Sequence, residues 1–319
     1  MVIRFLLGLQ VLVTMVAITA LFWSPFVHAA KGPISHPTKG RLEVVASDSE
    51  GRWIRHRSGV TRIPHKPQRI CALNFADELI TLDVMPAAVS TDWRGVKTDY
   101  LRERLAPATA IPHSLGQWLP SYEAIAALKP DLILTWTGDQ HTFDQLASIA
   151  PTVVVRTLGE VLAENGDLEA LYDRLRDVAL VLGVSERAEP AIAEFRTELV
   201  RTRERVGPAL AGQTIAFVRA RGRQWRLYGK RDECGGQALY DGLDLKAPAL
   251  VAEHGIELDP ERLITFDADH LVIVADTLLG SDEALARLRA HPLWRRVHAV
   301  RTGNVFEVTH FQHWILSGL

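Results

Sequence analysis

A short pattern occurs twice in the sequence, and it constrains the fold more than any other feature. Glu123 is followed eight residues later by Asp131, which leads into an apolar run, and Glu261 is followed eight residues later by Asp269, which also leads into an apolar run. In each copy we expect the glutamate to open a helix and the aspartate to precede a buried strand. Self-similarity at such long spacing indicates two duplicated lobes.

Strand-like and helix-like patterns alternate on both sides of one long, highly charged helical stretch. That stretch covers 168–206 and is interrupted near Gly183 and Pro190. Alternation of strands and helices favours parallel sheets. We therefore predict an α/β fold of two lobes with mainly parallel central sheets, joined by one long α-helix. The apolar runs expected to form strands lie at 69–73, 87–90, 131–136, 152–155, 214–219, 225–228, 270–275 and 305–308.

The first thirty residues differ from the rest of the chain. Arg4 is the only charge ahead of an apolar run from Phe5 to Trp23, and small residues near Ala30 offer a cleavage site. This pattern is typical of a secretory signal peptide, so we expect a periplasmic protein after cleavage. The length of the run leaves open an uncleaved N-terminal anchor. No cysteine lies near the cleavage site, so a lipid-anchored form is not expected.

Composition changes along the chain give the expected boundaries. The segment after the signal is polar and broken by Gly and Pro, which is typical of a leader without a packed core. We predict a signal peptide over 1–30, a leader over 31–62, an N-terminal lobe over 63–166, a helical stretch with the interlobe helix over 167–207 and a C-terminal lobe over 208–319.

The charged and reactive residues exclude several function classes. A net charge of −2 provides no basic field for nucleic acid. The two cysteines, Cys71 and Cys234, fall in different predicted lobes, so both are expected to be free, with Cys71 in the core. The twelve histidines are scattered, and only His310 and His313 lie close together. A metal site needs more convergent ligands than this, so none is predicted.

An enzyme would need a nucleophile or an acid–base pair in a recognisable setting. The sequence contains no G-x-S-x-G elbow, no P-loop and no G-x-G-x-x-G. We therefore expect a binding protein without catalytic activity and without a covalently bound cofactor. An exported enzyme on the same scaffold is the alternative from a different class, and it would require turnover that no motif here predicts.

Several segments together resemble one family, the helical-backbone (class III) periplasmic binding proteins of ABC transporters, which bind ferric siderophores or cobalamin. The resemblance covers roughly residues 63–314. The segments that carry it are PQRI at 67–70, NFADEL at 74–79, PSYEAIAALKPDLI at 120–133, LASIAPTV at 146–153 and HPLW at 291–294. Arg219-Ala220-Arg221 and the segment 226–230 look most like the branch that binds hydroxamate and citrate-type ferric siderophores.

The resemblance implies a ligand cleft between the lobes, an iron(III)–siderophore complex as ligand, and delivery to an ABC permease with its ATPase by a monomer. Cobalamin or haem on the same scaffold is the alternative. The sequence departs from the family at two points. Gln117 stands where hydroxamate binders often carry arginine, and the sequence ends at Leu319, about where the family begins its last helix.

Residues at predicted strand ends could hold such a ligand. A siderophore already surrounds its iron, so the protein must meet negatively charged oxygens and cover an organic shell. Arginine forks suit the first task and aromatic rings the second. Arg219 and Arg221 lie two apart at a strand's carboxyl end, so both should face one way, near the edge where α/β sheets bind ligands. Arg226 and Tyr228 repeat this spacing on the next strand.

The N-terminal lobe offers candidates in similar places. Each also has an ordinary structural explanation, either as a solvated surface residue or as part of the core. The candidates are Trp136 at the end of a predicted strand, Trp93 and Arg94 after another, and Gln117 and Trp118 in a loop flanked by Gly and Pro.

The repeated glutamates have a different expected role. In the family that the sequence resembles, glutamates matching Glu123 and Glu261 pair with arginines of the permease and set the orientation of docking. The structural alternative is helix capping, since acidic side chains in a first turn favour the helix dipole. Ser121 and Asp259 are plausible N-caps beside them, and the two interpretations are compatible.

Overall fold

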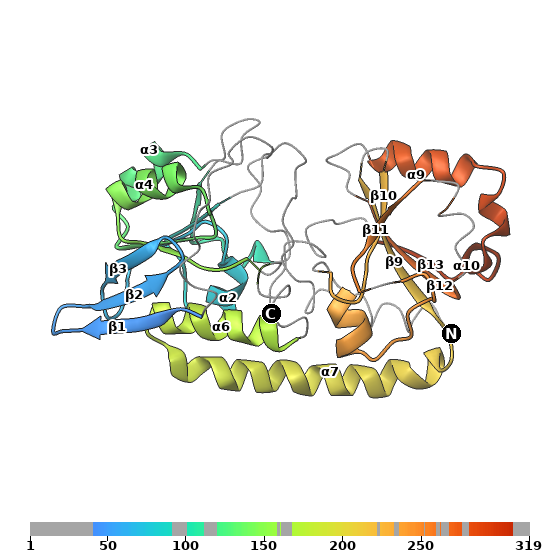
Figure 1. Ribbon diagram of the computed structural model, residues 1–319, viewed down its shortest axis with the longest axis horizontal. Coiled ribbons are helices and arrows are strands. Elements are labelled where there is room, and N and C mark those ends of the chain that lie inside the picture. The colour runs from blue at the N-terminus through green and yellow to red at the C-terminus, as the bar shows by residue number, and fades with distance from the viewer. Residues whose placement is uncertain are drawn as a thin grey trace. The chain divides into compact units, whose positions relative to one another are not determined.

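The computed structural model describes residues 41–90, 101–111, 120–157, 160, 168–221, 224–232, 236–251, 253–259, 262, 268–275 and 281–308. These fall into two compact units. The N-terminal unit takes in the described residues up to Thr157 and also Leu171–Ala193. The C-terminal unit takes in the described residues within Leu158–Ala170 and those from Glu194 onward. The long helix α7 (Ala188–Leu210) passes from one unit into the other (Figure 1). The predicted α/β class with two lobes and one long connecting helix is confirmed.

The N-terminal unit is built on a parallel five-stranded sheet of order β6-β5-β4-β7-β8. Cys71 and Ile133 on one face of this sheet pack with Ile125 and Leu146 from the helices above it. Figure 1 shows α3 and α4 on this side of the unit and α6 on the other. The elements are β4 (Ile70–Ala72), α2 (Ala76–Thr81), β5 (Ala88–Ser90), β6 (Thr109–Ile111), α3 (Tyr122–Leu128), β7 (Leu132–Thr135), α4 (Gln140–Ile149), β8 (Thr152–Val154) and α6 (Glu169–Leu182).

Residues 43–63 form a second sheet, where the sequence predicts a leader without regular elements. The antiparallel strands β1 (Glu43–Ser47), β2 (Arg52–His56) and β3 (Gly59–Ile63) pair in sequence order. The segment reads as polar because few of its side chains, among them those of Ile54, His56 and Ile63, are buried. A sheet that packs on one face keeps its other face polar, so its overall composition resembles that of a segment without a packed core.

The C-terminal unit has a mixed sheet of order β11-β10-β9-β12-β13, whereas the sequence predicts a mainly parallel one. Strands β9, β12 and β13 are parallel, but β10 runs antiparallel to both β9 and β11. Two residues separate β9 from β10, and so short a connection permits only a hairpin. The strands are β9 (Ile215–Arg221), β10 (Gln224–Leu227), β11 (Ile256–Leu258), β12 (His270–Ala275) and β13 (Val305–Val308).

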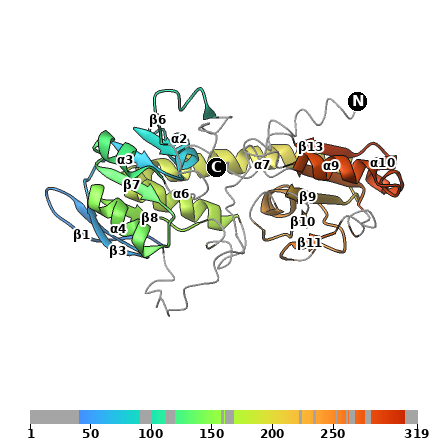
Figure 2. The same ribbon diagram turned by 90° about the horizontal axis from the view of Figure 1, so that it is seen from above.

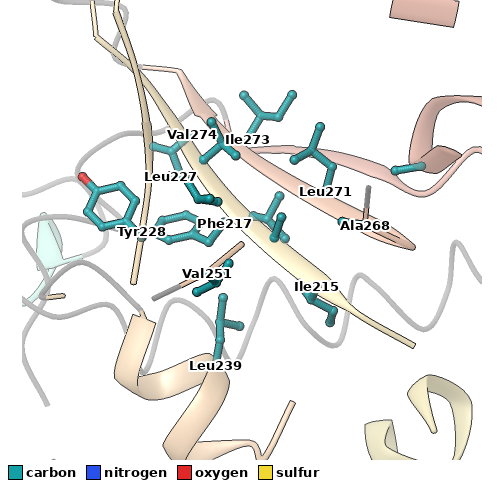
Figure 3. Packing of buried hydrophobic residues seen from close by; sticks show 14 of the residues in the cluster. Ile215, Phe217, Leu227, Tyr228, Leu239, Val251, Ala268, Leu271, Ile273 and Val274 are labelled. Atoms are coloured by element: carbon teal, nitrogen blue, oxygen red, sulfur yellow. The ribbon is translucent and has the colours of Figure 1, made fainter. Parts of the chain in front are cut away.

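Both faces of this mixed sheet are covered. Figure 3 shows Leu239 and Val251 on the side of β9 that carries Ile215 and Phe217, with Leu271 and its neighbours on β12 beyond them. Leu239 belongs to the π-helical turn η3 (Ala238–Gly242). The connection from β12 to β13 forms α9 (Ser281–Ala290), η5 (Trp294–Arg296) and α10 (His298–Arg301), which Figure 2 shows together at the red end of the chain.

The helical stretch between the sheets breaks at only one of the two predicted points. Helix α6 ends at Leu182 before Gly183, whose φ of +75° is left-handed, and η2 (Ser185–Arg187) leads into α7. Pro190 does not interrupt α7, because it lies in the first turn, where a missing N–H breaks no helical hydrogen bond.

The repeated aspartates have the same role in both units. The Asp131 carboxylate accepts hydrogen bonds from the backbone N–H groups of Gln68 and Arg69, both at 2.8 Å, just before β4. The Asp269 carboxylate accepts from the backbone N–H and the hydroxyl of Thr214, at 2.7 and 2.8 Å, just before β9. Each aspartate therefore ties the start of one buried strand to the start of its parallel neighbour.

In the described part of the chain, no helix combines the length and the apolarity that crossing a membrane requires. The predicted signal segment lies outside the described residues. Cys71 is a buried core residue without a disulfide, as predicted, and burial raises the pKa of its thiol to about 12. Cys234 lies outside the described residues.

Candidate ligand-binding site

One face of the β9–β10 hairpin is apolar near the core and carries arginines further along. Arg219 lies directly opposite Arg226 in the antiparallel register, so the two side chains share a face of the sheet. Two residues earlier on β9, the same face carries Phe217, which packs in the core. The strand pair thus runs from an apolar core to a pair of arginines at the carboxyl end of β9, as the sequence predicts for Arg219.

Tyr228 contacts both of these arginines. A guanidinium nitrogen of Arg219 lies 3.5 Å from the Tyr228 hydroxyl, at the long end for a hydrogen bond. The Arg226 guanidinium lies over the Tyr228 ring, 5.6 Å from its centroid, within range of a cation–π contact. Figure 3 shows the Tyr228 hydroxyl directed away from Phe217, whose ring lies 4.8 Å from that of Tyr228.

The three residues differ in their exposed fraction. Tyr228 is 3% exposed and Arg219 is 8% exposed, so both are buried, and Tyr228 belongs to the core cluster. Arg226 is more open, with 37% of its side chain exposed. Arg226 is therefore more accessible to solvent than Arg219, and Tyr228 is in part a core residue.

Two carboxylates neutralise Arg226, and the sequence analysis missed both. Its guanidinium lies 3.5 Å from Asp232 and 3.2 Å from Glu257. Burial disfavours the charge of Arg226, but Asp232, Tyr228 and Glu257 outweigh that effect and raise its pKa. Asp232 follows Tyr228 by four residues, so its position in sequence offered a weak signal. Glu257 lies on β11, directly opposite Arg226 on β10, and β11 was not predicted as a strand.

Arg221 ends β9 and pairs with Gln224, as expected for a residue at the carboxyl end of this strand. Its side chain lies outside the described part of the structure. The same holds for the whole of Trp93, Arg94, Gln117, Trp118 and Glu261. Predictions about these residues therefore remain predictions.

Trp136 directly follows β7, at the carboxyl edge of the N-terminal unit's parallel sheet. Its backbone N–H donates a hydrogen bond to the side-chain oxygen of Asn74 at 3.2 Å, and its carbonyl accepts one from the Arg57 guanidinium. The indole is partly buried. Asn74 and Arg57, which sequence analysis did not single out, thus fix the backbone that presents this ring.

Glu123 is exposed in the first turn of α3. The Ser121 hydroxyl caps this helix by accepting a hydrogen bond from the N–H of Ala124 at 3.3 Å, and it lies 3.2 Å from the Glu123 carboxylate. Asp259 accepts from the N–H of Arg262 at 2.7 Å. The predicted Ser121 cap is therefore present, Asp259 makes the hydrogen bond expected of an N-cap, and the Glu123 carboxylate faces solvent beside Ser121.

Direct metal binding finds no support among the residues that the structure describes. No three His, Cys, Asp or Glu side chains in that part of the chain come together as ligands. At the β9–β10 hairpin, Arg219 and Arg226 provide guanidinium donors, which suit the oxygens of a bound organic anion better than a bare cation.

The chain matches one protein family over most of its length. A model of that family, described as periplasmic binding protein, matches residues 78–310. The iron(3+)-hydroxamate-binding protein FhuD of Bacillus subtilis is 24% identical over 275 residues, covering 82% of this chain and 81% of FhuD. The Fe(3+) dicitrate-binding periplasmic protein FecB of Escherichia coli is 25% identical over 277 residues, covering 84% of this chain and 85% of FecB.

A solved structure agrees in fold. Staphylococcus aureus SirA complexed with staphyloferrin B superposes with a TM-score of 0.66 and 22% identity, covering 83% of this chain and 91% of that one.

Proposed function

The chain belongs to the periplasmic binding protein family, and from that premise we propose that it captures a ferric siderophore outside the inner membrane and delivers it to an ABC importer. The proposed ligand is of the hydroxamate or the mixed citrate–hydroxamate type. FhuD and FecB, with which the chain aligns over more than four fifths of its length, are named for ferric hydroxamate and ferric dicitrate respectively.

The grouping of Arg219, Arg226 and Tyr228 at one end of the β9–β10 hairpin carries this proposal. Guanidinium groups donate paired, charge-assisted hydrogen bonds to carboxylate and hydroxamate oxygens, and a phenol adds one donor on a rigid ring. Arg221 is proposed to extend this set, since it ends the same strand. The iron arrives as cargo inside its organic shell, so the protein needs no metal ligand and no covalent cofactor.

Aromatic and polar residues of the N-terminal unit are proposed to cover the rest of the ligand. Trp136 supports this role because its backbone is held at the carboxyl edge of a parallel sheet, where α/β proteins bind ligands. Trp93, Arg94, Gln117 and Trp118 complete the proposed set.

Delivery is proposed to use the two glutamates of the repeated pattern. Glu123 is exposed at the start of α3, where it could meet an arginine of the permease, and Glu261 is its counterpart in the second copy. In this proposal the protein is a periplasmic monomer after cleavage of its signal peptide. It reversibly carries the ligand, while the permease and its ATPase drive transport.

Titration of intrinsic tryptophan fluorescence with a panel of ferric hydroxamates and ferric citrate-type siderophores tests the proposal. We expect saturable quenching by at least one complex. The gallium(III) form of that complex should compete, because it keeps the same organic shell, and it lacks the optical absorption of iron. Arg219→Gln and Arg226→Gln should each weaken binding by about tenfold or more, since each removes a charge-assisted contact.

Arg201→Gln is the matched control, because Arg201 is exposed on α7 and pairs only loosely with Glu198, at 3.6 Å. It should bind as the wild type does. Absence of any response across the panel, in protein whose circular dichroism shows it to be folded, would overturn the proposal. A porphyrin or corrin absorption spectrum in the purified protein would favour haem or cobalamin instead.

A further inference from the structure

One buried carboxylate joins the loop after β10 to the loop before β11. Asp232, 8% exposed, accepts hydrogen bonds from the backbone N–H groups of Gly229 at 2.9 Å and Gly255 at 2.7 Å. The same carboxylate lies 3.5 Å from the Arg226 guanidinium and 3.7 Å from the exposed imidazole of His254. It therefore meets two backbone segments and one candidate ligand-binding side chain at once.

The two loops pack too closely for this carboxylate to move freely. A Cβ atom on Gly229 would lie 2.5 Å from the carbonyl carbon of His254 and 2.6 Å from the carbonyl oxygen of Glu253. On Gly255, a Cβ would collide with the Asp232 carboxylate itself. The backbone N–H of Arg231 also donates to the Glu253 carbonyl at 2.8 Å. Backbone contact of this kind requires glycine and fixes Asp232 in place.

The partners of Arg226 differ in how firmly they are held. Glu257 lies at 3.2 Å, but 53% of its side chain is exposed, and exposed ion pairs contribute little. Asp232 is fixed by two backbone donors and is nearly enclosed, so its charge acts on Arg226 with little screening. The Arg226 guanidinium thus has both this fixed carboxylate and the Tyr228 ring as neighbours.

We propose that Asp232 is a positioning residue, which holds Arg226 across the face of Tyr228 in the orientation that meets an anionic ligand oxygen. This inference rests on the proposed function of the hairpin. A side chain held in its bound orientation before the ligand arrives loses less conformational entropy on binding. Asp232 thus acts on affinity through Arg226, without touching the ligand.

A double-mutant cycle on ligand affinity tests this role. Asp232→Asn keeps an amide oxygen that can accept a backbone hydrogen bond but removes the charge that orients Arg226. We expect it to weaken binding of the tightest ferric siderophore in the panel by about tenfold in the wild-type background and to have almost no effect in an Arg226→Gln background. Any loss of thermal stability should appear in both backgrounds, because the backbone contacts are common to them.

Glu253→Gln is the matched control. Glu253 is a carboxylate of the same two loops, and it pairs with Arg231 at 2.8 Å rather than with Arg226. It should leave affinity unchanged. Equal weakening by Asp232→Asn in both backgrounds, or no weakening in the wild-type background, would overturn the inference.

A second variant keeps the inference testable if Asp232→Asn does not fold. Glu257→Gln should change affinity by less than about twofold, because Asp232 alone suffices to hold Arg226. A tenfold loss in this variant would show that the exposed carboxylate positions the arginine instead. Failure of the wild-type protein to bind any ferric siderophore would count against the proposed function itself. The variant results, by contrast, test only the role of Asp232.

Discussion

His56 shows how a single residue can link two sheets of the N-terminal unit. Its Nδ1 accepts a hydrogen bond from the N–H of Ser58 at 3.3 Å, so the proton of the neutral ring is on Nε2. Nε2 lies 2.8 Å from the Thr61 hydroxyl, which in turn donates to the Thr152 carbonyl at 2.9 Å. The ring therefore joins the β2–β3 hairpin to β8 in its uncharged form. Protonation of Nδ1 would break the first of these bonds.

Stability should accordingly depend on pH through His56. Burial, and then the charge of Arg57, lower the folded-state pKa of His56 from 6.5 to about 4. The unfolded chain therefore takes up a proton first as the pH falls. The contribution of His56 is complete above about pH 6.5 and is lost toward pH 4, by about 3 kcal/mol in all. Urea denaturation at several pH values measures this loss.

His56→Gln supplies the comparison for that measurement, since glutamine does not titrate. The difference in free energy of unfolding between wild type and variant should shrink as the pH falls from about 6.5 to about 4. A difference that stays constant over this range would mean that the ring is not held neutral in the folded protein.

At the scale of elements, two glycines with the same backbone geometry allow the cost of a left-handed φ to be distinguished from the cost of a steric clash. Gly183 and Gly212 have φ values of +75° and +77°. A Cβ on Gly183 would lie 2.5 Å from the carbonyl oxygen of His65, whereas a Cβ on Gly212 would meet nothing within 4 Å. Gly183 directly follows α6, and the His65 oxygen is a backbone atom, so rotation of a side chain cannot relieve the contact.

Alanine at the two positions should therefore have unequal effects. Gly212→Ala should lower the free energy of unfolding by about 1 kcal/mol, from the left-handed backbone alone. Gly183→Ala should cost about 3 kcal/mol, because the collision adds to the same strain. Thermal denaturation of both variants measures the two losses. Equal losses would show that the His65 backbone gives way.

Elements were predictable where burial leaves a mark on the sequence. The strands beginning at Ile70, Leu132 and His270 were located because they lie between layers and are almost wholly apolar. The β1–β3 sheet was missed because it packs on one face. The direction of β10 was also missed, since it depends on the length of a turn rather than on the residues of the strand.

The candidate site was predictable only in part, for a similar reason. Arg219, Arg226 and Tyr228 were proposed from their places near strand ends together with the family resemblance, and the structure brings these three side chains into contact. Asp232 was not found, because its partner Gly255 lies far along the chain and meets it only in the folded protein. Contacts between distant loops leave no periodic pattern to detect.

At the scale of the whole molecule, the two units share one plan. Each has a five-stranded sheet in which the first strand lies in the middle, with two later strands on either side. Asp131 and Asp269 perform the same tie in each. The units differ in how the strands on one flank pair. In the first sheet β4, β5 and β6 pair in parallel, whereas in the second sheet β9, β10 and β11 pair antiparallel.

The helix that passes between the units offers a test of their linkage. The division falls within α7, between Ala193 and Glu194, and Glu194 is exposed. Glu194→Pro removes the N–H that bonds to residue 190 and should lower the free energy of unfolding by about 3 kcal/mol, with a loss of far-ultraviolet circular dichroism. Glu194→Ala, a better helix former at the same place, should be neutral or slightly stabilising. An undisturbed proline variant would mean that α7 is not one continuous helix there.

The β9–β10 hairpin also bears on how a carrier of this kind acquires a new cargo. Positions 219 and 226 face each other, so paired exchanges there would alter charge and shape together, while Val218 and Trp225, on the opposite face of the same strands, remain in the core. If this hairpin holds the ligand as proposed, adaptation to another ligand would need only a few codons in one hairpin and would leave the packing of the opposite face intact.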